Sequence, residues 1–564
     1  MFLPTTRQEL EERGWDQLDV ILVTGDAYID SPHVGVAVVG HVLADVGYRV
    51  GVIGQPDVHS PEDITRLGEP ALFWGVSGGS IDSMVANYTA LKKPRRSDDY
   101  TPGGRNERRP DRAVIVYTNL IKRYFKDTVP IVLGGLEASL RRVSHYDYWD
   151  DALRRSILLD AKADYLIYGM VEKSVLAFAD AMRFGDPPRH LRGLCTVEDE
   201  PRRGYLEMPA HETVRKDKQA FIEMFHAFYQ DSDPQNARGL MQRYGNRYLI
   251  HNPPAPYLTQ EELDEVYALD FERDAHPYYR EQGEIRALET ITWAVNTHRG
   301  CYGECNFCAI GVHEGRTVRW RSPAAIEAEA RKLTQRPDFK GTIQDVSAPT
   351  ANMYGFECPR KLREGACRDR RCIYPDICPT LPVDHSPHLD LLGRLRRLPR
   401  VRNVFVSSGL RHDLLLHDEA HGDAYLEEVV KHHVSGQMKL APEHTEERVL
   451  RAMGKPGPEP LLEFRERFFR ATERAGLPQF LTYYIIAAHP GCTAGDMRRL
   501  RDFALRELEL LPEQVQIFTP TPSTYSSLMY YTEMDPFTGE RMFVEKGFRG
   551  KRRQKRIVTS PARQ

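Results

Sequence analysis

The chain has 564 residues, which at roughly 150 residues per domain predicts about three to four domains. Its 77 Lys and Arg nearly balance its 80 Asp and Glu, and this excludes both a uniformly basic nucleic-acid coat protein and a long acidic disordered chain. No apolar run approaches the roughly 18 residues that span a bilayer, and the N-terminus is acidic and polar where a signal peptide is basic and then apolar. We therefore expect a cytoplasmic protein.

The first 185 residues predict a parallel α/β domain of the Rossmann-like kind. Short β-rich runs alternate with helical patterns, one of which, 34–47, has apolar residues at helical spacing. Several runs end in Gly or Asp, at the sheet edge where open α/β sheets bind ligands. Residues 92–112 are charged and aperiodic, so we expect a mobile loop there. The β-rich runs are 19–30, 48–57, 71–79, 113–120, 128–139 and 163–172.

A second series of strands and helices follows a less regular stretch. Residues 186–285 mix turn signals with one or two amphipathic helices, and we predict a connecting region there. From 286 to 530, six strand–helix repeats, with helices such as 323–336, fit a partial (β/α)6 barrel, whose reactive groups lie at the C-terminal strand ends. Residues 531–564 form a basic C-terminal tail that we expect to be disordered. The β-rich runs of this part are 289–300, 340–350, 402–411, 434–442, 480–491 and 513–524.

The chain has nine cysteines, and in a reducing compartment their clustering favours metal binding over disulfides. A C-x3-C-x2-C triplet directly follows a β-rich run and consists of Cys301, Cys305 and Cys308. Thiolates are the soft ligands that iron–sulfur clusters require, and three of them leave one iron of a 4Fe-4S cluster open to a non-protein ligand. A zinc site completed by His298 or His313 is the alternative that spacing alone leaves open.

A second group of cysteines lies in a Cys-rich insertion, residues 357–379, with the spacing C-x8-C-x4-C-x5-C. Its members are Cys358, Cys367, Cys372 and Cys378. The segment is rich in Arg and lacks hydrophobic periodicity, so we expect a bound metal to order it. Zinc and an auxiliary 4Fe-4S cluster both suit four thiolates. The position near the expected barrel mouth favours the auxiliary cluster slightly.

The triplet, with Phe307 before its last cysteine, resembles the signature of the radical S-adenosylmethionine (radical SAM) superfamily. Residues 298–316 are also similar to the bacterial YgiQ family (UPF0313) within it. Long blocks in the same order extend this resemblance over most of the chain, at 134–172, 350–358, 372–379, 439–457 and 518–540.

The resemblance implies a mechanism. The three cysteines of the triplet would hold three irons of a 4Fe-4S cluster, and S-adenosylmethionine (SAM) would chelate the fourth. Reductive cleavage of SAM, with electrons from a donor such as flavodoxin or ferredoxin, would give a 5′-deoxyadenosyl radical that abstracts hydrogen from a substrate.

The resemblance also suggests which residues contact SAM. Phe307 would lie beside the adenine. The superfamily's Gly-Gly-Glu motif, which meets the methionine amino group, is missing from the corresponding residues 345–350. Ser407 and Ser408 at one strand end, and Glu443 with His444 at the next, are candidates for ribose or carboxylate contacts by placement.

The N-terminal domain resembles the cobalamin-binding Rossmann-like domains that precede some radical SAM cores, in segments 132–139 and 168–172. Those domains often ligate cobalt with the histidine of an Asp-x-His-x-x-Gly loop. Here the spacing from Asp30 to His33 is one residue longer, and that from His33 to Gly35 one residue shorter, than in that loop. We therefore expect the fold without cobalamin.

The substrate is not named by these patterns. The basic tail and the Arg-rich loop favour a polyanion such as RNA, and a protein side chain or a metabolite are the other classes. The competing hypothesis is a non-catalytic, zinc-stabilised nucleic-acid-binding protein, which predicts two zinc ions and no iron.

Overall fold

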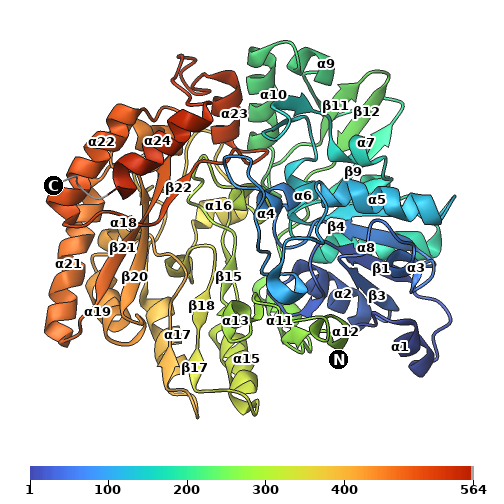
Figure 1. Ribbon diagram of the computed structural model, residues 1–564, viewed down its shortest axis with the longest axis horizontal. Helices are drawn as coiled ribbons and strands as arrows, with labels where there is room; N and C mark the ends of the chain where they lie inside the picture. Colours follow the sequence, from blue (N-terminus) through green and yellow to red (C-terminus); the bar gives the residue numbers. More distant parts are fainter. Residues whose placement is uncertain (561–564) are drawn as a thin grey trace. The chain divides into compact units, whose positions relative to one another are not determined.

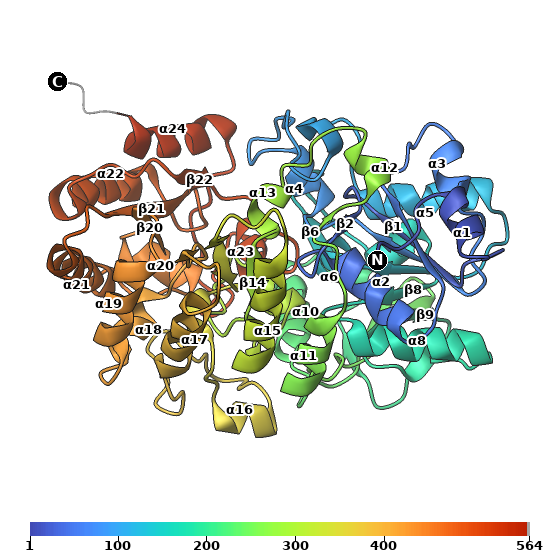
Figure 2. The same cartoon turned by 90° about the horizontal axis from the view of Figure 1, so that it is seen from below.

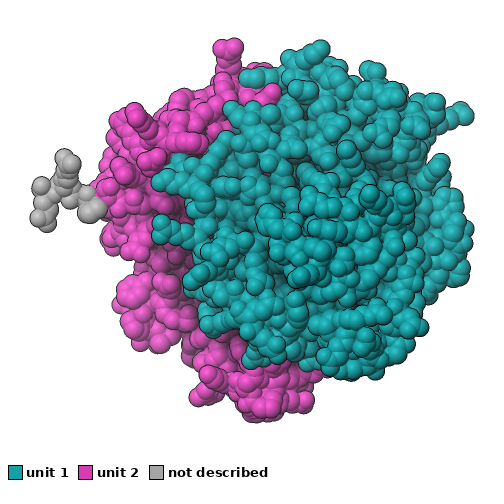
Figure 3. All heavy atoms as spheres, turned by 45° about the vertical axis from the view of Figure 1, so that its right-hand side comes forward, with its two compact units in different colours: residues 1–292 teal, residues 293–564 magenta. Residues whose placement is uncertain are grey.

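The computed structural model describes residues 1–560, and the chain divides into two compact units, Met1–Thr292 and Trp293–Gln564 (Figure 3). The sequence predicted a connecting region over 186–285. That region belongs to the first unit instead, because four of its strands complete the sheet of that unit.

Short runs rich in Val, Ile and Leu form a nine-stranded sheet in the first unit (Figure 1). In sheet order the strands are β10 (Leu206–Met208), β11 (Leu240–Tyr244), β12 (Arg247–His251), β9 (Leu194–Glu198), β8 (Tyr165–Ile167), β5 (Ile131–Gly134), β4 (Phe73–Ser77), β1 (Val20–Thr24) and β3 (Val50–Gly54). The strands from β8 to β3 pair in parallel, whereas β9 and β12 pair antiparallel and extend one edge. Every residue of β1 and β3 is buried, as expected of parallel strands covered on both faces.

Helices cover this sheet on both faces (Figure 2). The helices of this unit are α1 (Arg7–Glu12), α2 (Gly35–Asp45), α3 (Glu62–Thr65), α4 (Ser83–Asn87), α5 (Ala113–Tyr124), α6 (Gly135–Leu140), α7 (Ile157–Ala161), α8 (Glu172–Phe184), α9 (His211–Val214), α10 (Lys218–Gln230), α11 (Gln260–Ala268), α12 (Pro277–Arg280) and α13 (Leu288–Ile291). Helix α2 packs against α8, and Val20 and Leu22 of β1 join their apolar side chains in one core. The expected helix over 34–47 is α2.

Two expectations for the first unit were wrong. Residues 113–120, expected as a strand, begin helix α5, because their buried residues recur at helical spacing despite the β-branched content, at Ala113, Tyr117 and Leu120. Residues 92–112, expected as a mobile loop, are packed against the sheet through the buried side chain of Arg109.

The barrel strands of the second unit follow one another in chain order and pair in parallel, whereas the short strands β15 (His298–Arg299) and β16 (Arg319–Trp320) form a separate antiparallel pair. The barrel strands are β14 (Ala294–Asn296), β17 (Thr342–Ile343) with β18 (Asp345–Ser347), β19 (Asn403–Val404), β20 (Gln437–Glu443), β21 (Phe480–Ala487) and β22 (Val515–Ile517). The helices between them include α15 (Pro323–Gln335), α17 (Ser386–Arg396), α18 (His412–His417), α19 (Gly422–His432), α20 (Glu447–Met453), α21 (Glu459–Ala475) and α22 (Ala494–Phe503). This order confirms the predicted fold class, a partial (β/α)6 barrel preceded by a Rossmann-like domain.

The predicted basic tail is ordered over most of its described length. Helix α24 (Phe548–Thr559) follows α23 (Tyr525–Thr532) and packs against α22 and β22. Its buried residues, Lys551, Gln554 and Val558, recur at helical spacing. The end of the predicted tail, 561–564, lies outside the described residues. Within residues 1–560, no helix combines the length and the apolar character needed to cross a membrane.

Candidate functional site

The cysteine triplet lies in a tight loop that follows β15 (His298–Arg299). Gly300 opens the loop with a φ of +81°, and a Cβ there would lie 2.3 Å from the carbonyl oxygen of Thr317, so only glycine fits. Glu304 also has a positive φ, +46°, and its buried carboxylate lies 3.3 Å from the Arg316 guanidinium. Strained backbone held in place by buried contacts is typical of functional loops.

This loop brings the three sulfur atoms of the triplet into one small space. A Cβ at Gly303 would lie 3.2 Å from Cys301 Sγ and 3.9 Å from Cys305 Sγ. Burial raises the pKa of Cys301 and of Cys308, and the neighbouring Cys305 thiol raises both further. Arg411 acts in the opposite direction: its Nη1 lies 4.0 Å from Cys305 Sγ, and its charge lowers the pKa of Cys301.

The triplet could hold either a zinc ion or an iron–sulfur cluster, and the two differ in the ligands that they need. Tetrahedral zinc, with Zn–S bonds of about 2.3 Å, holds its ligand atoms about 3.8 Å apart. Within residues 1–560, no trio of His, Cys, Asp or Glu ligand atoms within 4.8 Å of one another includes a triplet cysteine. His298 has both ring nitrogens engaged, with Thr297 Oγ1 at 2.9 Å and the Thr350 carbonyl oxygen at 3.1 Å. A zinc ion held by His298 would require the loss of these ring contacts, whereas three thiolates alone can each bind a different iron of a cluster.

Three of the four cysteines of the second group lie next to a threonine or a lysine. Its members are Cys358, which is buried, and Cys367, Cys372 and Cys378, which are half-buried. Thr380 Oγ1 lies 3.5 Å from Cys358 Sγ and 3.2 Å from Cys378 Sγ. Cys372 Sγ lies 3.7 Å from Lys361 Nζ. Burial raises the pKa of Cys372 to about 12, and the positive charge of Lys361 limits this rise.

Two basic residues connect the Cys-rich insertion to the triplet loop. Lys361 is buried and lies 3.3 Å from the Glu357 carboxylate. Arg371 donates hydrogen bonds to the Glu304 carbonyl oxygen at 3.0 Å and to Asn306 Oδ1 at 2.7 Å. Neither residue could be predicted from the sequence, because charged side chains in an irregular segment carry no periodic signal.

Phe307, the predicted adenine neighbour, is half-buried in the triplet loop. Its ring meets the His489 ring edge to face, with 6.3 Å between the centroids. His489 Nε2 lies 2.6 Å from Ser526 Oγ, and burial lowers the pKa of His489 to about 3, so the ring is neutral. This contact joins the triplet loop to the segment that follows β21.

Ser407 is exposed just beyond the end of β19. Its N–H donates to Asp345 Oδ1 at 2.8 Å, and its hydroxyl donates to the Gln344 carbonyl oxygen at 2.8 Å. Ser408 donates its hydroxyl to the other oxygen of Asp345 at 2.6 Å. Asp345 thus connects the ends of the second and third barrel strands, and both serine hydroxyls already have an acceptor within the protein.

Glu443 ends β20 in a strained conformation, with a φ of +69°. Its side chain is buried, and Oε1 lies 3.8 Å from Lys455 Nζ. Oε2 is also buried and has no hydrogen-bond partner among the described residues. Burial raises the pKa of Glu443 to about 7, and the charges of Lys455 and Arg411 limit this rise. A buried, unpartnered carboxylate oxygen at a barrel strand end calls for a ligand.

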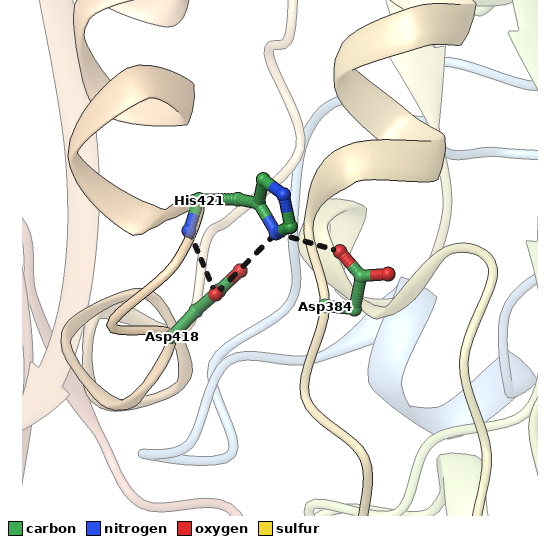
Figure 4. Close-up of side chains that lie close together, drawn as sticks. All are labelled: Asp384, Asp418 and His421. Carbon is green, nitrogen blue, oxygen red and sulfur yellow. Dashed lines mark hydrogen bonds and ion pairs between the residues drawn. The ribbon is translucent and has the colours of Figure 1, made fainter.

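A different group of potential metal ligands lies between α17 and α19 (Figure 4). Asp384, Asp418 and His421 place ligand atoms within 4.8 Å of one another. However, the Asp418 carboxylate already accepts hydrogen bonds from the His385 ring at 2.8 Å and from the His421 backbone at 2.9 Å. Asp418 thus links the residues that directly precede α17 and α19, and its contacts are explained without a metal.

The strand ends of the first unit form the edge where an open α/β sheet binds ligands. Here that edge is filled by Arg109, which is buried and pairs with Asp26 at 2.8 Å and with Asp98 at 3.0 Å. It also donates to the Gly78 carbonyl oxygen at 2.7 Å, and a Cβ at Gly79 would lie 2.5 Å from its Nη1. The glycines at these strand ends make room for the chain's own arginine.

Comparison with known proteins assigns the chain to a family. A model described as "Radical SAM N-terminal" matches residues 2–294, and one described as "Radical SAM superfamily" matches 295–504. A UPF0313 protein of Fusobacterium nucleatum is 53% identical over 559 residues, which is 99% of this chain and 98% of the relative. The chain belongs to the UPF0313 family. A UPF0313 protein of Thermotoga maritima is 48% identical over 562 residues, 99% of this chain and 98% of the relative. The family resemblance expected from the sequence is confirmed, and this UPF0313 protein is a radical SAM enzyme.

Solved structures similar to this UPF0313 protein show the same fold at low sequence identity. The radical SAM methyltransferase TsrM of Kitasatospora setae, solved with tryptophan and a SAM analogue, has a TM-score of 0.51 and 14% identity, covering 89% of this chain and 74% of its own. OxsB, a cobalamin-dependent SAM radical enzyme solved with aqua-cobalamin, has a TM-score of 0.50 and 12% identity, covering 93% of this chain and 57% of its own. The likeness supports the assignment of a Rossmann-like domain and a radical SAM domain.

Proposed function

We propose that Cys301, Cys305 and Cys308 hold a 4Fe-4S cluster whose open iron binds SAM, and that the enzyme cleaves SAM reductively. A cluster held by these three cysteines would supply the electron that cleaves the C5′–S bond of SAM, and the products would be methionine and a 5′-deoxyadenosyl radical able to abstract a hydrogen atom from the substrate. The observation that carries the proposal is the gathering of three thiols in one loop, while His298, the candidate fourth ligand of a zinc ion, has both ring nitrogens engaged within the protein. Burial raises the pKa of Cys301, and the charge of the Arg411 guanidinium opposes this rise.

Three further residues suit the SAM pocket. Glu443 offers an unpartnered, buried carboxylate oxygen to a ribose hydroxyl. Phe307 presents an apolar ring next to the last cysteine and excludes water there. Ser407 is exposed at a strand end and keeps the lone pairs of its hydroxyl oxygen free to accept a hydrogen bond.

The cysteines of the insertion are proposed as a second metal site. The proximity of Cys372 to Lys361, and of Cys358 and Cys378 to a shared Thr380, supports a thiolate site that also includes Cys367. Four thiolates suit both zinc and an auxiliary 4Fe-4S cluster, and metal analysis of the purified protein distinguishes the two.

The first unit is proposed to work without cobalamin. A corrin ring at the strand ends would have to displace Arg109 from Asp26 and Asp98, and that would leave buried carboxylates unpaired. His33 lies with its Nδ1 3.4 Å from Ser31 Oγ. Equilibrium dialysis with hydroxocobalamin tests this, and stoichiometric binding would contradict it.

The reductant is proposed to be an external low-potential donor, flavodoxin or ferredoxin, in the cytoplasm.

The test of SAM cleavage is anaerobic reconstitution with iron and sulfide, followed by incubation with dithionite and SAM and assay of 5′-deoxyadenosine. Cys305→Ala should lose 5′-deoxyadenosine formation entirely. The matched control is Cys195→Ala, which removes a buried cysteine of β9 and should leave product formation intact. Zinc without iron in the reconstituted protein, or undiminished product from Cys305→Ala, would refute the proposal.

A further inference from the structure

Helix α24 carries a row of arginines on its outer side. Its buried residues, Lys551, Gln554 and Val558, define the face that packs on the protein. At 100° per residue, four exposed arginines fall on the opposite side of the helix: Arg549, Arg552, Arg553 and Arg556. In Figures 1 and 2, α24 lies beside α22 at the periphery of its unit, so this row faces away from the barrel.

This row has no counter-charge of its own. Among residues 1–560, none of the four arginines lies within ion-pair distance of a carboxylate. The nearest acid in the chain, Glu545, is occupied at the start of the helix, where its carboxylate accepts the Gly547 N–H at 2.9 Å. Like charges three and four residues apart destabilise a helix, and an anionic partner would remove that repulsion.

Exposed aromatic rings accompany the arginines. Phe548, the first residue of α24, is 41% exposed, and Phe543 just before it is 46% exposed. Phe548 is one helical turn from Arg552, so a ring and a guanidinium lie on neighbouring positions of the surface. Cations that track phosphates, next to rings on which bases stack, are the combination that binds single-stranded nucleic acid.

The helix is firmly attached to the barrel, so the row has a fixed position. Gln554 accepts the Ala488 N–H at 2.9 Å and donates to the Cys492 carbonyl oxygen at 3.0 Å. Between these two residues lies His489, whose ring meets Phe307 of the triplet loop. The buried face of α24 is thus joined to the segment that contacts the triplet loop, while the arginine row on the opposite face stays open to a partner.

We propose that α24 and Phe548 form a binding surface for single-stranded nucleic acid. The guanidinium groups bind the phosphates of the strand, and the phenyl ring stacks on a base. RNA and DNA share this chemistry. An acidic protein would use the charges alone, and the exposed ring next to them favours a strand with unstacked bases. This proposal goes beyond the reaction proposed above and does not depend on it.

The test is fluorescence anisotropy of the full-length, anaerobically purified protein with labelled 20-nucleotide single strands of RNA and of DNA, and with an RNA duplex. We expect Arg552→Gln/Arg553→Gln/Arg556→Gln to weaken single-strand binding at least tenfold. The slope of log affinity against log salt should fall by about 2, from about 0.7 per lost phosphate contact. The matched control is Arg394→Gln/Arg470→Gln/Arg474→Gln, which makes the same charge change on other exposed arginines and should change affinity less than twofold. The arms with RNA and DNA show which strand is preferred.

Phe548→Leu separates stacking from charge. We expect this variant to weaken single-strand binding about fivefold or more without changing the slope of log affinity against log salt. If circular dichroism shows that the triple variant is unfolded, Phe548→Leu replaces it as the test of the proposal. The proposal is overturned if the triple variant binds as the control does. It is equally overturned if the duplex binds as tightly as the single strand, or if polyglutamate competes as well as the oligonucleotide, because the face would then be a general polyanion or acidic-protein site.

Discussion

The buried carboxylate of Glu443 opposes folding when it ionises. Burial raises its pKa from 4.5 to about 7, so between these pH values the folded chain binds a proton that the unfolded chain has released. Stability therefore falls as pH rises through this window, by about 3 kcal/mol in total. Glu443→Gln removes the titration, and the variant should gain stability relative to the wild-type protein between pH 5 and pH 8 in urea denaturation.

The control for this prediction is Glu513→Gln, which alters an exposed glutamate of the same unit and should show no such pH dependence. If Glu443→Gln and the wild-type protein keep a constant difference in unfolding free energy from pH 5 to pH 8, the carboxylate is not buried in solution as described. With SAM present, the same variant should bind SAM more weakly at pH 8 while keeping its iron.

Gly300 is required both by its backbone conformation and by its surroundings. Its φ of +81° disfavours any side chain, and a Cβ would also lie 2.3 Å from the Thr317 carbonyl oxygen. Gly300→Ala should destabilise the second unit by about 3 kcal/mol and reduce its iron content. Gly476→Ala is the matched control, since its φ is +65° with no atom within 4 Å of the new Cβ. A loss of about 1 kcal/mol for both variants would contradict the steric part of this prediction.

At the scale of residues, the sequence predicts ligands better than it predicts what surrounds them. Cys301, Cys305 and Cys308 are close in sequence, so their spacing alone predicts that they share a site. Arg411 could not be predicted, because it is separated from the triplet by about a hundred residues and only the barrel brings the two together. Glu443 was predicted as a candidate from its place at a strand end. The burial of its side chain and the lack of a partner for Oε2 among residues 1–560 could not be predicted.

At the scale of elements, the Cys-rich insertion supports the triplet loop through Arg371. This side chain donates to Glu304 and Asn306, on either side of Cys305. Arg371→Gln should destabilise the loop by about 2 kcal/mol, since it removes hydrogen bonds from a charged donor. We expect the reconstituted cluster to lose iron to a chelator about tenfold faster, followed by the decay of its absorbance near 400 nm.

Arg363→Gln is the matched control, because Arg363 belongs to the same insertion but contacts only the exposed Glu364. Its iron loss should match that of the wild-type protein. Equal rates for Arg371→Gln and Arg363→Gln would mean that the insertion does not position the triplet loop.

The elements themselves were predicted unevenly. Parallel strands with continuous apolar runs, and helices such as α2 and α15, are evident from periodicity, because both carry a regular buried pattern. Helix α5 was mistaken for a strand because Val and Ile dominate it. Helix α24 was mistaken for a disordered tail because its charge hides three buried positions, at Lys551, Gln554 and Val558, that only packing against α22 reveals.

At the scale of the whole molecule, each unit contains its own core and its own hydrogen-bonded strands. All nine strands of the large sheet lie within residues 1–292, and its core is drawn from the same residues. The core of the barrel is drawn from residues of the second unit alone, between Val295 and Leu508. Residues 1–292 expressed alone should therefore fold cooperatively, with a sharp thermal transition and no bound iron, because no cysteine of either metal group is included. Calorimetry and iron analysis measure both properties. A broad transition with strong dye binding would show that the sheet needs the barrel to fold, and the two units would then have to be treated as one cooperative domain.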